Sequence, residues 1–443
     1  MTATVAARAF AAWLGLWAFV FSVDAQTPAF VLHAGSLLAI PGEKPTSRQT
    51  ILVSDGRILA IRSGFLSADE IGAGPGAQTV DLSNAFVLPG LIDLHVHLST
   101  EAAGGEALRV VTRNAADLAL AARLHARETV EAGFTTVLDL GTARAAHTEA
   151  VYALRRAIDL GIATGPRILI AGSPISATGS SRTGRYTSDV AAAVGIQGTC
   201  DGADDCARAV RQQVAEGADV INMYNTGSIG DLTVVQQAFT DSEMEAIVST
   251  AHASGLRVIA DGHTAAGINS ALRAGVDIID TGPWPDEQSF RLMKRGRVYF
   301  EPHMYAFKVA VAEMRSGSTS VEDQPESPII TRLTGVLKHP FSAQRAFEMN
   351  IPLAYGSDTG IVRHGDNAGD FAELVRIGMS PMQAIQVATV NSAAAVGLGH
   401  EIGSLEVGKR ADIIATDGNP LEDVEQLRHV SFVMRDGHVL KMH

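Results

Sequence analysis

The sequence has few cysteines and no excess of positive charge. Its 443 residues contain only Cys200 and Cys206, in the stretch Cys-Asp-Gly-Ala-Asp-Asp-Cys. No further cysteine or histidine lies close enough to complete a zinc site with them. A local disulfide or a pair of free thiols remains, and we expect the disulfide. The net charge of −13 argues against a general nucleic-acid or anionic-membrane surface.

Three common active-site motifs are also missing from the sequence. It contains no G-x-x-x-x-G-K-[ST] phosphate loop and no G-x-S-x-G nucleophile elbow. Gly165, Gly172 and Gly179 do not form a dinucleotide-binding fingerprint that opens a helix. These absences argue against a P-loop nucleotidase, a serine hydrolase of the α/β type and a Rossmann dehydrogenase.

The N-terminus carries the longest apolar run. Arg8 is followed by Phe10 to Val23, which is apolar apart from Gly15 and Ser22, and then by Val-Asp-Ala25. This pattern predicts a signal peptide over residues 1–25, cleaved after Ala25. The alternative is a membrane anchor, but a run of about 14 residues is short of the ~20 that a span requires. We therefore expect an exported protein, periplasmic or secreted, in which a disulfide can form.

The remaining chain predicts two structural units. Residues 26–88 and 403–443 hold short β-rich runs with the turn signals Ser-Asp-Gly-Arg57 and Arg-Asp-Gly-His438, which favours one small β-sandwich domain built from both chain ends. Residues 89–402 alternate strand and helix patterns. The predicted strands are 91–97, 134–140, 167–172, 218–224, 256–262, 276–280, 298–303 and 351–357, and glycine follows several of the helices. This α/β pattern predicts a (β/α)8 TIM-type barrel, with the chemistry at the C-terminal strand ends.

The first barrel strand carries the most informative motif, Leu-Pro-Gly-Leu-Ile-Asp-Leu-His95-Val-His97-Leu. Side chains two apart on a strand project to the same face, so the imidazoles of His95 and His97 converge. Two neutral imidazoles at a strand end form a chelate for a divalent metal. Asp358 holds the matching position after the eighth strand. If the His-x-His motif is considered alone, two histidines placed there by chance are the alternative to a metal site.

Six segments together resemble the amidohydrolase superfamily of metal-dependent hydrolases, in its imidazolonepropionase-like and prolidase-like branch. They are Pro-Gly-Leu-Ile-Asp-Leu-His-Val-His97, Gly-Phe-Thr-Thr-Val-Leu-Asp-Leu-Gly141, Gly-Ala-Asp-Val-Ile221, Ala-Gly-Val-Asp277, Gly-Ser-Asp-Thr359 and Gly-Ser-Leu-Glu-Val-Gly-Lys-Arg-Ala-Asp412. The resemblance covers nearly the whole mature chain. It implies a barrel with a small β domain, metal at the strand ends, and a homo-oligomer that no particular stretch requires.

The family pattern is kept on strands one and eight and changed between them. The resemblance implies a bridging lysine on strand four and histidines on strands five and six, where this chain has Asn222, Asp261 and Thr281. Neither an amide nor a threonine is a good replacement ligand, so the second metal site of the family looks lost. His95, His97 and Asp358, with Asp261 completing the set, predict one divalent ion: zinc first, with manganese or iron as alternatives.

Further residues at predicted strand ends could contact the substrate. His263 shares a strand face with Asp261 and could be a ligand, a ligand's partner or a donor to the scissile carbonyl; a structural histidine is the alternative. Asn222, Tyr224, His303 and His364 are candidate substrate contacts, and ordinary structural or loop positions are the alternative for each.

The resemblance and the retained ligands predict an exported hydrolase of an amide-type C–N bond in a small molecule: an N-acyl amino acid, a dipeptide or a cyclic amide. Asp358 would be the general base of metal-activated water, and His263 would polarise the carbonyl. Two alternatives stay open. One is a metal-free acid/base isomerisation or elimination at Asp261, His263 and Asp358. The other is a non-catalytic binding protein. We expect no nucleic-acid partner and, after signal cleavage, no membrane association.

Overall fold

The computed structural model describes residues 29–101, 112–180, 187–227, 237–316, 334–335 and 341–442. The predicted signal peptide, residues 1–25, lies outside these residues. Within the described ranges, no helix is both long enough and apolar enough to cross a membrane.

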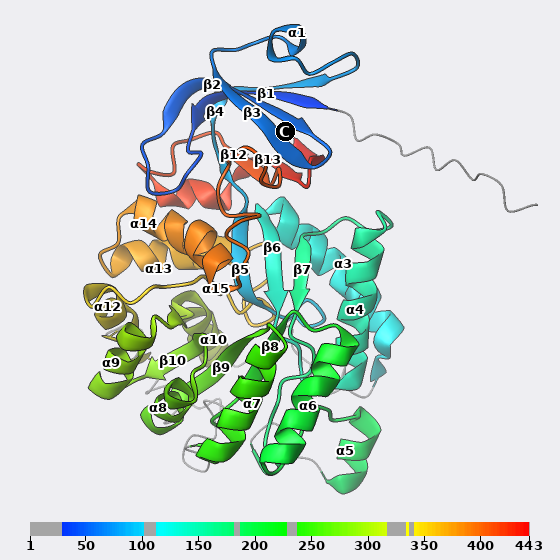
Figure 1. The fold of residues 1–443 in the computed structure, drawn as a ribbon, viewed down its shortest axis with the longest axis vertical. Helices are drawn as coiled ribbons and strands as arrows, with labels where there is room; N and C mark the ends of the chain where they lie inside the picture. The colour runs from blue at the N-terminus through cyan, green and yellow to red at the C-terminus, as the bar shows by residue number, and fades with distance from the viewer. Residues whose placement is uncertain are drawn as a thin grey trace, which may run out of the picture.

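Both ends of the chain contribute to one small β domain (Figure 1). Its seven-stranded sheet has the order β14-β13-β12-β4-β1-β2-β3. The strands are β1 Phe30–Leu37, β2 Thr46–Ser54, β3 Arg57–Ser63, β4 Gln78–Pro89, β12 Ile413–Thr416, β13 Val430–Arg435 and β14 His438–Met442. β4 and β12 pair antiparallel and join the two ends. Asp55 and Gly56 have φ of 50° and 74°, the left-handed values that a tight hairpin with Asp-Gly needs.

Parallel strands form the barrel below this domain in Figure 1. β5, β6 and β7 form one sheet, and β8, β9, β10 and β11 form another. Their bounds are β5 Leu91–Val96, β6 Phe134–Asp139, β7 Arg167–Ile170, β8 Val220–Tyr224, β9 Arg257–Thr264, β10 Ile278–Trp284 and β11 Tyr299–Glu301.

Three parallel bridges join these two sheets into a ring. Ile175, which follows β7, pairs with Met223 of β8, Phe300 of β11 pairs with Leu353, and Val96 of β5 pairs with Thr359. Residues 353–359 therefore take the place of the eighth strand, between β11 and β5. The predicted (β/α)8 barrel with a small β domain is confirmed. The eighth strand is irregular because only isolated bridges hold it.

Helices lie between consecutive strands around the barrel (Figure 1). The helices of eight or more residues are α3 Ala115–Glu131, α4 Ala145–Asp159, α6 Ala203–Glu216, α7 Asp241–Ala253, α8 Ala265–Ala274, α9 Glu287–Gly296, α10 Met304–Ser316 and α12 Phe341–Glu348. Shorter ones are α1 Ala68–Ile71, α5 Ser188–Val194, η2 Asn367–Gly369, α13 Asp370–Arg376, α14 Pro381–Gln386, η3 Val387–Asn391, α15 Ser392–Ala395 and η4 Val424–Arg428. Asn114 begins α3 with a capping box that includes Asp117.

The predicted disulfide is confirmed: Cys200 and Cys206 are bonded, and Cys206 lies in α6. It ties the first turn of that helix to the chain that enters it.

The barrel interior changes from apolar to polar toward the C-terminal strand ends. One buried cluster takes an apolar residue from each of several strands, among them Val220, Ile259, Ile278 and Ala354. Side chains two residues further along a strand point to the same side. At those positions the chain has Asn222, Asp261, Asp280 and Gly356, and on β11 Glu301 follows Tyr299 in the same way. A polar layer therefore lies directly above the apolar layer.

Candidate metal centre

Three of the predicted ligands meet at the C-terminal end of β5. His95 Nε2 lies 3.1 Å from His97 Nε2 and 3.4 Å from Asp358 Oδ1, and His97 Nε2 lies 3.7 Å from the same oxygen. A tetrahedral ion with ligand bonds of about 2.0–2.1 Å has ligand–ligand edges of about 3.3 Å. The three atoms therefore have the spacing that a zinc-like ion requires. We call this group the upper site.

Asp93 fixes the upper site from behind. Its carboxylate accepts hydrogen bonds from the Ser357 backbone N–H at 2.9 Å and from the His95 N–H at 3.2 Å. The Asp358 N–H also donates to the His95 carbonyl at 3.0 Å. Asp358 itself has a φ of 54°, a left-handed conformation that is uncommon outside glycine. These bonds between β5 and residues 357–358 hold the Asp358 side chain against the two imidazoles.

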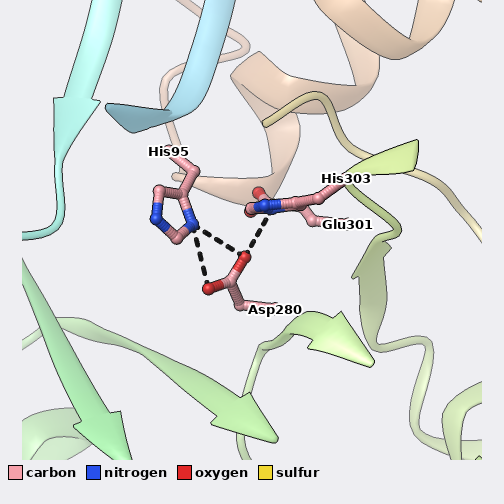
Figure 2. Close-up of side chains that lie close together, drawn as sticks. All are labelled: His95, Asp280, Glu301 and His303. Carbon is pink, nitrogen blue, oxygen red and sulfur yellow. Dashed lines mark hydrogen bonds and ion pairs between the residues drawn. The ribbon is translucent and has the colours of Figure 1, made fainter. Parts of the chain in front are cut away.

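A second group of ionisable side chains lies on the other side of His95, and Figure 2 shows it. His95 Nδ1 lies 3.0 Å from both oxygens of Asp280. His303 Nε2 lies 2.7 Å from Asp280 Oδ1 and 3.7 Å from Glu301 Oε2. We call His95, Asp280, Glu301 and His303 the lower cluster. His95 belongs to both groups because its two ring nitrogens face opposite ways.

Burial and neighbouring charges strongly shift the pKa values of the side chains in the lower cluster. Burial lowers the pKa of His95, but Asp280 and Asp358 outweigh that effect and raise it to about 9. Burial raises the pKa of Asp280, but His95 and His303 more than reverse this and hold it well below its usual range. The pKa of Glu301 rises to about 8, chiefly through burial. Without a bound cation, Asp280 is thus an anion between imidazolium groups; a cation would reverse the His95 shift, because ligation requires neutral imidazole.

The predicted strand-end residues Asp261, His263 and Asn222 have partners of their own. Asp261 Oδ1 is 3.5 Å from His263 Nε2, and the Nδ1 of His263 is 3.0 Å from Thr226 Oγ1. Among the described residues, the ligand-capable groups with all atoms within 4.8 Å of one another do not include Asp261. Its role as a ligand stays a prediction, as does the role of His263. Asn222 donates to the Leu140 carbonyl at 3.1 Å.

Three predicted substrate contacts are buried. His303 is 1% exposed and belongs to the lower cluster. Tyr224 is 4% exposed. His364 stacks on His125 at 4.4 Å between ring centres, and its Nε2 lies 2.9 Å from the Thr100 carbonyl. The structure brings His303 toward the metal-ligand region and places His364 beside α3.

Asp280 and Glu301 are site residues that sequence reasoning missed. Both are fully buried acids in largely apolar strands. The signal that could have revealed them is the two-residue alternation in Ile278-Ile-Asp280 and Tyr299-Phe-Glu301. The family resemblance points to Thr281, the position aligned with a family histidine, and not to its neighbour Asp280. Thr281 has a φ of 69°, which is a clear outlier for a β-branched residue.

The comparisons with known proteins agree with this architecture. The model of the amidohydrolase family matches residues 86–441. Ochratoxinase from Aspergillus niger is 27% identical over 93% of this chain and 86% of its own length. An imidazolonepropionase from Geobacillus sp. is 38% identical over 15% of this chain and 16% of its own. A crystal structure of a Xaa-Pro dipeptidase with bound methionine in its active site has a TM-score of 0.82 and 31% identity, and covers 93% of this chain and 99% of its own. The chain belongs to the amidohydrolase family, as the resemblance implied, and is a hydrolase of carbon–nitrogen bonds.

Proposed function

We propose that this protein uses one divalent ion at the upper site to hydrolyse the amide bond of an N-acyl amino acid, a dipeptide or a cyclic amide. The observation that carries the proposal is the convergence of His95, His97 and Asp358. The relatives named as an ochratoxinase and as a Xaa-Pro dipeptidase support an amide substrate.

The upper site suits a catalytic ion. Two imidazoles and one carboxylate are a common ligand set for zinc, and manganese or iron also accepts them. Such an ion, when bound, supplies Lewis acidity that polarises a carbonyl and acidifies water. Asp280 lies against His95 Nδ1 at 3.0 Å and fixes the orientation of this ring, so that Nε2 faces His97 and Asp358.

Asp358 is placed to move protons in this reaction. Its side chain is 15% exposed, which leaves it open to water and substrate while its backbone is fixed by the His95 carbonyl. As general base it would take a proton from the attacking water and pass it to the leaving nitrogen. His263, whose Nδ1 side is engaged by Thr226, would donate from Nε2 to the scissile carbonyl.

A cavity of about 240 Å³, lined in part by residues that follow His97 in the sequence, supports the substrate class. Ser99, Glu101, Arg113, His125 and His147 line it together with apolar residues of α3. The guanidinium group of Arg113 can form a bidentate pair with a substrate carboxylate. This favours an N-acyl amino acid or a dipeptide over an uncharged cyclic amide.

The first experiment compares metal content and turnover in three proteins: wild type, Asp358→Asn, and the His95→Ala/His97→Ala double variant. We expect bound zinc, manganese or iron in the wild type and loss of the upper-site ion in the double variant. Asp358→Asn should keep the fold and lose turnover of dipeptides and N-acyl amino acids. Full activity in Asp358→Asn would exclude its role as base. Turnover by a metal-free wild type would instead favour acid/base chemistry at Asp261, His263 and Asp358.

We also propose that the protein is exported. The apolar N-terminal run and the Cys200–Cys206 disulfide support this, because disulfides persist mainly in oxidising compartments. Expression with an N-terminal sequencing step tests it: a mature protein that begins at Gln26 is expected, and a retained Met1 in the exported fraction would contradict cleavage after Ala25.

A further inference from the structure

We propose that the lower cluster is a second divalent-cation site, with His95 Nδ1, Asp280, Glu301 and His303 as its ligands. It extends the proposed centre and shares His95 with it. When both sites are filled, His95 would bridge the two ions as an imidazolate, with its remaining ring proton released to water. The inference does not depend on the identity of the substrate. The family resemblance places a second metal on strands four, five and six. This site instead uses β5, β10 and β11.

The donor atoms have suitable chemistry and spacing. Two imidazoles and two carboxylates form a four-ligand set for zinc or manganese. One donor atom from each residue lies within 4.8 Å of all the others. Asp280 is central, at 3.0 Å from His95 Nδ1 and 2.7 Å from His303 Nε2. Small rotations of Glu301 and His303 would bring both to bonding distance of an ion beside Asp280.

Unsatisfied polar atoms in this cluster point to a ligand. Both Glu301 oxygens are buried and find no hydrogen-bond partner among the described residues, and His303 Nε2 lies 3.7 Å from Glu301 Oε2. Glu301 and Asp280 are 0% exposed. Buried polar atoms are almost always partnered, and an ion is one of the few explanations when they are not. A proton on Glu301 would balance the charge but would leave its oxygens without partners.

Gly356 gives the cluster its room. A Cβ at this position would lie 2.8 Å from His303 Nε2, 3.0 Å from His95 Cβ and 3.1 Å from Glu301 Oε2. Strand eight therefore contributes no side chain here, and the ligands of β5 and β11 can approach each other. A divalent charge between Asp280 and Glu301 would neutralise both carboxylates in a space closed to water.

The test is metal stoichiometry by mass spectrometry after removal of metal and reconstitution with Zn²⁺ or Co²⁺. Wild type should bind two ions per chain. Glu301→Gln and His303→Asn should each bind one, and the Co²⁺ absorption bands of the lower site should disappear in both. Asp358→Asn should lose the other set of bands. Glu373→Gln is a matched control, since Glu373 is buried outside the cluster, and should still bind two.

Two results would overturn the inference. The first is a wild type that binds a single ion whose affinity Glu301→Gln leaves unchanged. The second is two ions that Glu301→Gln and His303→Asn leave in place while His263→Ala removes one. Should the variants not fold, anomalous scattering from wild-type crystals decides: a peak between Glu301 and His303 is expected, and its absence refutes the site. Two bound ions without amide turnover would sink the proposed function and leave this inference intact.

Discussion

Gly356→Ala is the sharpest test of how tightly the two imidazole groups are packed. The added methyl group would lie 2.8 Å from His303 Nε2 and 3.0 Å from His95 Cβ. Contacts below 3.0 Å are not tolerated, so a neighbour must shift. Both histidines are buried and held by Asp280, so neither can swing into solvent. The φ of Gly356 is not in the left-handed range, and the effect of the substitution is therefore steric alone.

Overpacking a filled core costs typically about 1–3 kcal/mol. If His95 moves to relieve the contact, its nitrogens leave their positions and metal affinity decreases. Because about 1.4 kcal/mol corresponds to a tenfold change in binding, the Kd for the metal should rise roughly 5- to 150-fold. If the barrel backbone moves instead, the free energy of unfolding decreases by the same amount. The two losses together should reach about 1–3 kcal/mol.

Two assays separate the loss of metal affinity from the loss of stability. Chelator competition measures the Zn²⁺ affinity, and urea unfolding of the metal-free protein measures the free energy of unfolding. Gly399→Ala is the matched control, because its Cβ would meet nothing nearer than Ala394 at 3.9 Å and its φ is not left-handed. The control should match the wild type in both assays. A Gly356→Ala protein that also matches it in both would show that the lower cluster is looser than the distances indicate.

Three further predictions concern stability. Burial raises the pKa of Asp370 to about 7, so the protonated carboxyl favours the folded state at low pH and the free energy of unfolding falls as pH rises from about 4 to 7. Asp370→Asn should reduce this fall by roughly 3–4 kcal/mol in urea unfolding. A pH dependence of stability that the substitution leaves unchanged would refute the raised pKa. Cys200→Ser/Cys206→Ser opens a loop with a sequence separation of 6 and should cost roughly 2 kcal/mol, a loss that reduction of the wild type should reproduce. Arg167→Leu leaves the buried Asp412 without its cation at 2.6 Å and should cost roughly 3–5 kcal/mol of unfolding free energy, whereas a loss below about 1 kcal/mol would mean that the pair adds little.

Much of the fold could be predicted because its determinants are local. The alternation of apolar strands and amphipathic helices indicates the eight barrel strands within a few residues, and Asp-Gly turns indicate the hairpins of the small domain. The eighth strand, predicted at 351–357, is irregular in a way that no local pattern specifies, because residues 353–359 are held only by isolated bridges to Phe300 and Val96. The seven-stranded order of the small domain depends on pairing between β4 and β12, which no local pattern specifies.

In the candidate site, too, local determinants could be predicted from the sequence and long-range ones could not. His95 and His97 could be predicted to converge because strand periodicity alone places them together. Asp280 and Glu301 could not be weighed in the same way, because their importance depends on which face of β10 and β11 points into the barrel. That depends on long-range register: Asp280 lies beside Asp261 of β9 and Glu301 of β11. The family pattern has its ligand at the position of Thr281, so it carries no information about Asp280 beside it.

The changes at Asn222, Asp261 and Thr281 therefore need not mean that this barrel carries less metal chemistry than its relatives. Polar side chains in a barrel interior are costly unless partnered, and a chain that had abandoned metal could have filled this layer with apolar residues at no loss. Instead it has Asp280, Glu301 and His303, all buried, around the inner nitrogen of a retained ligand. The position of these groups beneath His95 is explained if the ligand set moved inward and toward β11 while the upper site kept its form.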